Sequence, residues 1–275
     1  MKLKLFEINP ILQPFIDKIW LFESSYDMHP EDLRMVIPSG NINLIYTLKG
    51  DYQTSSLNGS IHSTYSNNLT LIGQQSSALT LIGLEPVTSL GVSFSPTGAY
   101  RFLGEQIFET KDLVLNLEDI FNKETRILKE QMFEAFNNQD KVHVFQNFLI
   151  SKLSTPKIQE PIVELVTKKI ISSNGLASLA KLCEQTNWSK RHLNRVFSEI
   201  VGQNIKSWMQ TIRFKHLHQL LQKDCKENKE AIKAFYMAYY DQAHFIHSFK
   251  KITGKTPNTF MKSVNQFGNY FNRIK

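Results

Sequence analysis

Polar side chains suited to contact with a polyanion recur at helical spacing in two segments near the C-terminus. Residues 187–197 align with residues 239–249 at a constant offset of 52 positions. In each copy the polar residues fall on one face of a predicted helix, opposite an apolar stripe spaced by three and four residues. These polar residues are Lys190, Arg191, Asn194 and Arg195 in the first copy, and Gln242, His244 and His247 in the second. This pattern favours binding to nucleic acid over catalysis.

The predicted elements that position these side chains have the order and lengths of a helix-turn-helix motif. Ser189 and Asp241 are predicted N-caps, and Gly202 and Gly254 follow the two helices as expected C-terminal stops. Each helix is preceded by a shorter predicted support helix and a turn of a few residues. The support helices are expected at residues 176–185 and 229–238.

Apolar residues between the two units mark one long amphipathic helix from about residue 205 to 221. A helix of about 17 residues spans about 25 Å, and one turn of DNA is about 34 Å. The two polar helices could therefore read successive major-groove segments on one side of a duplex. The alternative is an ordinary helical bundle whose charged faces are only solvated, and the duplication of caps and stripes argues against it.

The charge of the chain is divided unequally. Residues 1–155 contain 12 Lys and Arg against 17 Asp and Glu, a net charge of −5. Residues 156–275 contain 20 against 8, a net charge of +12, which favours a polyanionic partner such as duplex DNA. The polar, proline-containing stretch SKLSTPKIQE is the best linker candidate. We therefore expect domains at 1–155 and 156–275.

Composition excludes several other classes of protein. Apolar runs are too short to span a bilayer, and no signal-peptide core is present, so a soluble cytoplasmic protein without membrane contact is expected. Two cysteines, Cys183 and Cys225, cannot form a disulfide framework or a four-ligand zinc site. His29 and His62 lack the paired spacing of metal ligands. No catalytic constellation is found, so we expect neither enzyme activity nor a cofactor.

The first half has the alternation of an antiparallel β domain, and no residue in it points to a ligand. Residues 41–48 alternate apolar and polar side chains, and LTLIG occurs at 69–73 and again at 79–83, which predicts strand–turn–strand. Short strands divided by Gly, Ser and Asn clusters indicate a sandwich or barrel. Helical spacing follows in the segments 97–104, 117–136 and 141–153.

Two C-terminal stretches resemble the AraC/XylS family of bacterial transcription regulators. They are SLAKLCEQTNWSKRHLNRVFSEIVGQNIKSWMQTIR, from Ser178, and AYYDQAHFIHSFKKITGKTPNTF, from Ala238. The segment HFxxxFKKxxGxxP, beginning at His244, is the most specific element. The first half resembles sensor domains of the family more weakly, through Arg34 and the segments IPSG, LIG and FSPTGA.

The resemblance implies an α+β fold class. An N-terminal cupin-like β-barrel with trailing helices would precede a C-terminal all-α domain with two helix-turn-helix units joined by a long helix. The histidine and glutamate cluster of metal-binding cupins is missing, so no metal is expected. The implied partners are double-stranded DNA and RNA polymerase, and the resemblance allows a small-molecule effector and a homodimer. The implied location is cytoplasmic and nucleoid-associated.

The resemblance also assigns roles to individual residues. Arg191, Asn194 and Arg195 occupy positions that touch base edges, and arginine and asparagine can bind guanine and adenine through paired hydrogen bonds. In the second unit, the residues expected to contact bases are Gln242, His244 and His247. Phosphate contacts are expected from Lys190, Lys206, Lys250 and Lys251.

Departures from the family pattern concentrate in the second unit. Tyr239 stands where the family prefers glycine, and Phe235 replaces a small residue between the helices. We therefore expect the first unit to supply most of the sequence discrimination, while the second mainly contributes affinity.

Two rival functions stay open on the sequence alone. One is a constitutive DNA-binding regulator whose N-terminal domain only dimerises, and the other is a DNA-targeted enzyme. A cavity of ligand size in the N-terminal domain would favour sensing over the first rival. The second rival would need a reactive cysteine in the first half, which contains none.

Overall fold

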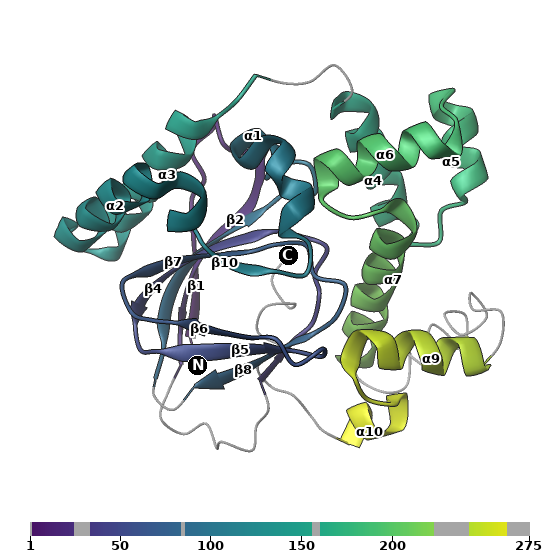
Figure 1. The fold of residues 1–275 in the computed structure, drawn as a ribbon, viewed down its shortest axis with the longest axis horizontal. Coiled ribbons are helices and arrows are strands. Elements are labelled where there is room, and N and C mark those ends of the chain that lie inside the picture. The colour runs from purple at the N-terminus through teal and green to yellow at the C-terminus, as the bar shows by residue number, and fades with distance from the viewer. Residues whose placement is uncertain (1, 25–33, 84–85, 156–159, 223–241, 263–275) are drawn as a thin grey trace.

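The computed structural model describes residues 2–24, 34–83, 86–155, 160–222 and 242–262. They form an N-terminal domain rich in strands and a helical C-terminal domain (Figure 1). This confirms the expected α+β class.

One sheet provides the main platform of the N-terminal domain. It has six antiparallel strands. Their order is β1 (Lys2–Phe6), β2 (Ile16–Glu23), β9 (Thr88–Phe94), β4 (Asn43–Lys49), β7 (Asn68–Ile72) and β10 (Val114–Asn116). A register shift between Ile16 and Lys18 bulges β2 at Asp17, close to the C-terminal domain.

A second antiparallel sheet faces the first. Its order is β3 (Arg34–Val36), β8 (Leu79–Gly83), β5 (Tyr52–Ser56) and β6 (Ile61–Thr64). The two LTLIG segments are strands as predicted, but they lie in different sheets, so residues 73–78 form a crossover and the strand–turn–strand interpretation was wrong. Among the described residues, no strand of one sheet pairs with a strand of the other, so the expected barrel is not closed.

Alternation along the strands gives the six-stranded sheet two different faces. Leu44 and Tyr46 of β4 point to the face covered by helices, where Leu128 and Phe145 complete one core. The covering elements are α1 (Tyr100–Leu103), the 3-10 helix η1 (Gly104–Thr110), α2 (Glu118–Glu134) and α3 (Asn138–Lys152). The opposite face looks toward the second sheet, and Trp20 and Phe22 of β2 pack there with Ile45 and Leu81.

Five of the helices in the described part of the C-terminal domain were predicted from the sequence, and the last, α10, was not. The helices are α4 (Glu160–Ser172), α5 (Leu179–Thr186), α6 (Lys190–Val201), α7 (Ile205–Gln222), α9 (Gln242–Thr253) and α10 (Pro257–Lys262). Asn174 and Gly175 have positive φ at the end of α4, which confirms the predicted left-handed stop. The second support helix, expected at 229–238, lies outside the described residues, as do Phe235 and Tyr239.

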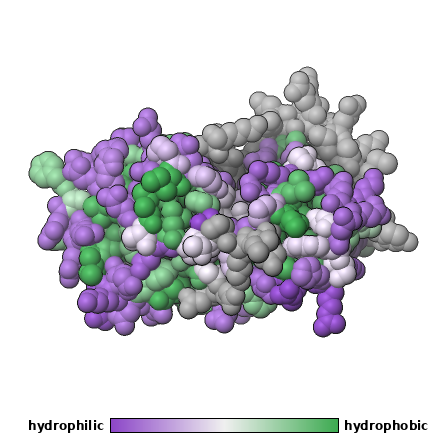
Figure 2. All heavy atoms as spheres, turned by 90° about the horizontal axis from the view of Figure 1, so that it is seen from above, coloured by the Kyte–Doolittle hydropathy of each residue, from purple (hydrophilic) through white to green (hydrophobic). Residues whose placement is uncertain are grey.

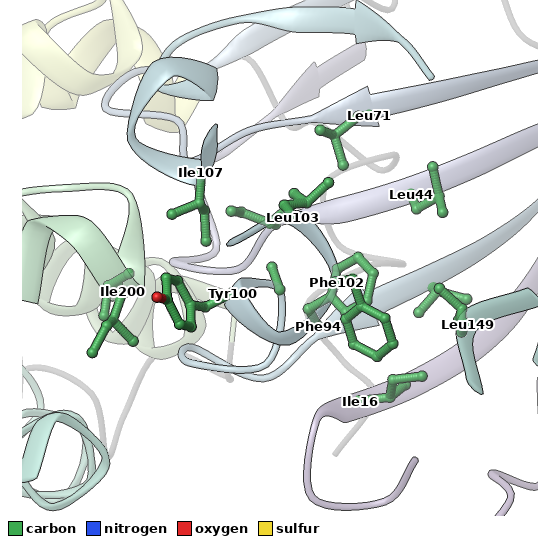
Figure 3. Close-up of a cluster of buried hydrophobic side chains, with 14 of the residues drawn as sticks. Ile16, Leu44, Leu71, Phe94, Tyr100, Phe102, Leu103, Ile107, Leu149 and Ile200 are labelled. Atoms are coloured by element: carbon green, nitrogen blue, oxygen red, sulfur yellow. The ribbon is translucent and has the colours of Figure 1, made fainter. Parts of the chain in front are cut away.

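The hydrophobic core continues from one domain into the other. Tyr100 of α1, Ile107 of η1 and Ile200 of α6 belong to the same buried cluster, and their side chains approach one another in Figure 3. The first helix-turn-helix unit is therefore packed directly onto the helical end of the N-terminal domain.

Candidate nucleic-acid interface and the adjoining cavity

Local sequence fixes the first helix-turn-helix unit, α5 and α6. The Ser178 side chain caps α5 by accepting a hydrogen bond from the Lys181 amide, and Ser189 caps α6 by accepting one from the His192 amide at 3.2 Å. Asn187 ends α5 in the left-handed conformation, with φ of 55°. Gly202 ends α6 with φ of 82°. Both predicted caps of the first recognition helix, Ser189 and Gly202, are confirmed.

The outer face of α6 carries the residues predicted to contact DNA. Lys190, Arg191 and Arg195 are exposed, while Leu193 and Phe197 are buried on the opposite face. The Arg195 guanidinium forms an ion pair with Glu199 one turn later, with an N–O distance of 2.6 Å. Three cationic side chains therefore face solvent on a helix whose inner face is fixed by packing.

Asn194 differs from its neighbours because it takes part in the fold. Its side-chain oxygen accepts a hydrogen bond at 3.2 Å from the backbone amide of Ile205, the first residue of α7. A paired contact to adenine uses the asparagine oxygen and nitrogen together. Such a contact would have to share the Asn194 oxygen with the Ile205 amide or displace that amide.

Helix α9, the predicted recognition helix of the second unit, presents a comparable face. Phe245, Phe249 and Ile252 are buried as predicted. The exposed residues of the helix are Ala243, His244, Ile246, His247, Lys250 and Lys251. Gln242 begins α9, and its side chain lies outside the described residues.

Helix α7 is the predicted connector of the two units, and α6 and α9 lie near its two ends (Figure 1). Its 18 residues correspond to about 27 Å at 1.5 Å per residue. Lys206 is exposed in its first turn, where the Asn204 side chain accepts a hydrogen bond from the Ser207 amide at 2.9 Å. The connector therefore has the predicted length and places Lys206 close to the end of α6.

Direct hydrogen bonds link the N-terminal domain to the connector α7 and to α9. The Trp208 indole N–H of α7 donates to the Gly40 carbonyl at 3.0 Å, and the Gln74 amide donates to the same carbonyl at 2.9 Å. The Ala78 amide donates to the Ile252 carbonyl near the end of α9 at 2.7 Å. Residues 73–78 thus reach the connector and the second unit.

A cavity of about 660 Å³ lies between the two sheets and extends to α7, and we refer to its end at α7 as the opening. Trp20, Phe22 and Ile45 form one wall, and Leu79 and Leu81 form the other. Asn174, Ile212, Lys215, His216 and Gln219 of the C-terminal domain line the opening. The volume falls within the ordinary range of small-molecule sites, about 300–1,000 Å³.

Three charged groups gather at this opening, Asp17 and Lys18 of β2 and Lys215 of α7. Burial lowers the pKa of Lys215, and the charge of Asp17 opposes this effect. Burial lowers the pKa of Lys18, the positive charge of Lys215 lowers it further, and Asp17 raises it. Burial raises the pKa of Asp17, against a hydrogen bond from the Asn41 side-chain amide at 2.6 Å. Two cations and one anion leave the opening with excess positive charge.

Sequence reasoning missed this cavity. The signal was the position of Lys18, which shares a strand face with Trp20 and Phe22, because a lysine on an apolar inward face requires an explanation. Nothing local to residue 215 could have paired it with β2, since that contact depends on how the domains pack.

Other kinds of site find no support in the described residues. They contain no group of three or more His, Cys, Asp or Glu side chains that could hold a metal ion. No helix of the described ranges is both long and apolar enough to cross a membrane. In the view of Figure 2, hydrophilic side chains cover much of the visible face and interrupt its hydrophobic patches.

Two family models match the chain. Residues 182–263 match a helix-turn-helix domain, and residues 7–116 match a domain of unknown function, DUF6597. No curated protein matches.

The solved structures similar to this chain include ToxT and CuxR. ToxT from Vibrio cholerae is 16% identical, with a TM-score of 0.45, over 89% of this chain and 97% of that one. A structure of ToxT with bound unsaturated fatty acid is 17% identical, with a TM-score of 0.40, over 83% and 89%. The AraC-like transcriptional activator CuxR is 11% identical, with a TM-score of 0.25, over 90% and 78%.

Proposed function

Because the chain belongs to the AraC/XylS family of transcription regulators, we propose that α6 and α9 read two successive major-groove segments of one duplex. The chain is a DNA-binding transcription regulator. The observation that carries the finer proposal is the construction of α6. Its inner face is buried and both ends are capped, so Arg191 and Arg195 project from a rigid support.

The residues divide into two roles under this proposal. Base contacts belong to Arg191, Asn194, Arg195, Gln242, His244 and His247, and phosphate contacts belong to Lys190, Lys206, Lys250 and Lys251. The hydrogen bond from Ile205 to Asn194 makes Arg191 and Arg195 the stronger base readers of the first unit. The exposed face of α9 offers imidazoles and aliphatic side chains, which suits a unit that adds affinity more than discrimination.

Selection of bound fragments from random duplex DNA with the purified full-length protein tests this proposal. We expect a site with two recognised segments about one helical turn apart. Substitution of Arg195 should relax positions in one segment, and substitution of His247 should act on the other. Enrichment of a single short segment, unchanged by His247→Ala, would refute the role of α9.

We further propose that the N-terminal domain senses a small molecule in the cavity. Apolar walls and two lysines at the opening match an organic acid with an apolar body, whose carboxylate would lie between Lys18 and Lys215. Such an effector would contact β2 and α7 together. Since α7 joins the two units, binding of an effector in the cavity would favour one arrangement of α6 and α9 relative to DNA over others. The cavity favours sensing over an N-terminal domain that only dimerises.

Calorimetry with dodecanoate and the uncharged dodecanol tests the effector class. We expect dodecanoate to bind more tightly, and we expect Lys18→Gln and Lys215→Gln to remove that advantage. Lys49→Gln, a substitution of an exposed lysine at the end of β4, is the matched control. Equal binding of acid and alcohol would overturn the acid effector. DNA affinity measured with and without dodecanoate then tests the coupling.

The remaining expectations complete the proposal. Regulation would follow from contact with RNA polymerase by a protein bound to its operator, as a monomer or a homodimer. We propose that the domain boundary lies near residue 155. The residues that follow it, 156–159, lie outside the described part. An enzymatic role has no supporting observation among the described residues.

A further inference from the structure

The inner wall of the cavity is organised in three rows across β2, β9 and β4. Lys18, Ser93 and Asn43 are register partners in the first row, and Trp20, Gly91 and Ile45 follow in the second. The third row contains Phe22, Ser89 and Thr47. Directly opposed residues share a sheet face, so the wall changes from polar to apolar and back to polar with depth.

Gly91 makes the middle row possible. A Cβ atom at this position would lie 2.1 Å from the Trp20 ring, so the indole rests directly on the glycine backbone. The Trp20 indole N–H reaches Ser93 Oγ at 3.2 Å, and Ser93 donates to the Asn43 side-chain oxygen at 2.6 Å. The first row therefore satisfies its own hydrogen bonds, while the middle row offers an apolar surface.

The inner end of the cavity differs because buried hydroxyls lie behind its lining. Thr47 and Thr64 are both 0% exposed, and among the described residues their hydroxyls have no hydrogen-bond partner of ordinary geometry, although the Tyr52 phenol lies near both. Ser89 and Tyr52 lie in front of them and line the cavity. Thr64 is the register partner of Tyr52 in the second sheet, and Thr47 is that of Ser89 in the first. We call Thr47, Tyr52, Thr64 and Ser89 the hydroxyl cluster.

Tyr52 connects the buried threonines to the cavity. Burial raises the pKa of the Tyr52 phenol, and the nearby hydroxyls of Thr47 and Thr64 lower it in part, so the phenol is neutral at physiological pH. A neutral phenol can accept a hydrogen bond from a threonine and donate its own proton into the cavity. Buried polar groups without a well-formed hydrogen bond are rare in native proteins.

No cationic side chain is found at the inner end among the described residues that line the cavity; Lys18, Lys215 and His216 all belong to its opening. A second carboxylate would therefore find no counter-charge there. A hydroxyl or carbonyl group would suit the hydroxyl cluster, because it exchanges hydrogen bonds without carrying charge into the interior.

We propose that the effector carries a second, uncharged polar group that hydrogen-bonds to the hydroxyl cluster. The first and third rows are four residues apart along β2, which corresponds to about 14 Å at 3.4 Å per residue. The ligand class is thus a medium-chain acid with a hydroxyl or oxo group near its far end. This inference rests on the proposed acid effector and specifies its chemistry.

Calorimetric titration of the full-length protein with dodecanoate and its ω-hydroxy derivative tests the inference. We expect the hydroxy acid to bind about tenfold more tightly, the effect of one net hydrogen bond. Tyr52→Phe should reduce this ratio toward one. Tyr65→Phe, which removes an exposed phenol, should leave the ratio at its wild-type value. Ser89→Ala provides a second variant, and thermal unfolding establishes that each variant is folded.

Three outcomes decide the question. A hydroxy-acid preference that is lost in Tyr52→Phe or Ser89→Ala supports the inference. Equal affinity of the two acids for the wild-type protein would overturn it and leave the acid effector intact, with the inner end occupied by water. Failure of both acids to bind would overturn the acid effector and this inference together.

Discussion

Arg195 allows the sharpest test of the DNA interface. Its side chain is 58% exposed, and its guanidinium is paired with Glu199 on the same helix. A contact to guanine requires the guanidinium to exchange this ion pair for the base edge. We therefore expect Arg195→Ala to weaken binding of a preferred site and to relax one base position of it.

The magnitude follows from the two competing interactions. A paired arginine–guanine contact contributes about 1–3 kcal/mol of discrimination. An exposed ion pair between residues four apart on a helix contributes about 0.3–0.5 kcal/mol, which must be given up. The net loss should be about 0.5–2.7 kcal/mol, or about 2-fold to 100-fold in Kd. Glu199→Gln should strengthen binding slightly, since it frees Arg195.

Fluorescence anisotropy with a labelled preferred duplex and its single-base variants measures both effects. The comparison must be made at one fixed salt concentration, because phosphate contacts also respond to salt. Lys190→Ala is the matched control and should weaken all duplexes by a similar factor. If Arg195→Ala also weakened every duplex equally, the assignment of Arg195 to a base edge would be refuted.

The remaining predictions concern stability, followed by denaturant unfolding of the purified protein. Asn194→Ala should lower the free energy of unfolding by about 1 kcal/mol, because the Ile205 amide loses its acceptor. Asn194→Asp keeps that oxygen and should stay within about 0.5 kcal/mol of wild type. Equal losses in the two variants would contradict the capping role. Trp208→Phe should cost about 2 kcal/mol, since Trp208 is 0% exposed and donates to Gly40, and an unchanged midpoint would contradict this link between the domains. Burial lowers the pKa of His218 from 6.5 to about 4, so the unfolded chain binds more protons between these values and stability falls as pH decreases through that window. The loss should approach about 3 kcal/mol below pH 4, and His218→Leu should flatten the pH profile; a profile unchanged by the substitution would exclude His218 as its source.

Features set by local sequence were predicted well. Ser189 and Gly202 delimit α6, and Asn174 and Gly175 stop α4, because capping chemistry and positive φ depend on residue type at one position. The apolar stripe of α9 was also predicted, since helical periodicity is read directly from spacing. The roles of the DNA-facing residues stay predictions.

Features set by long-range packing were not predicted. Identical LTLIG segments enter different sheets, and nothing in five residues indicates which neighbour each will pair with. Asn194 has the expected place on α6, but its oxygen is used by a residue 11 positions later. Lys18 and Lys215 are almost two hundred positions apart in sequence and meet only because α7 packs beside β2.

The hydrogen bond from Ala78 to Ile252 has a consequence for protein engineering. It gives the last turn of α9 a partner supplied by the N-terminal domain, and Gly254 lies against Leu57 of that same domain. A chimera that grafts these DNA-binding helices onto a foreign sensor would strip α9 of this support. Transplants should therefore retain residues 57 and 73–78 with the helices, or provide a substitute loop of matching shape.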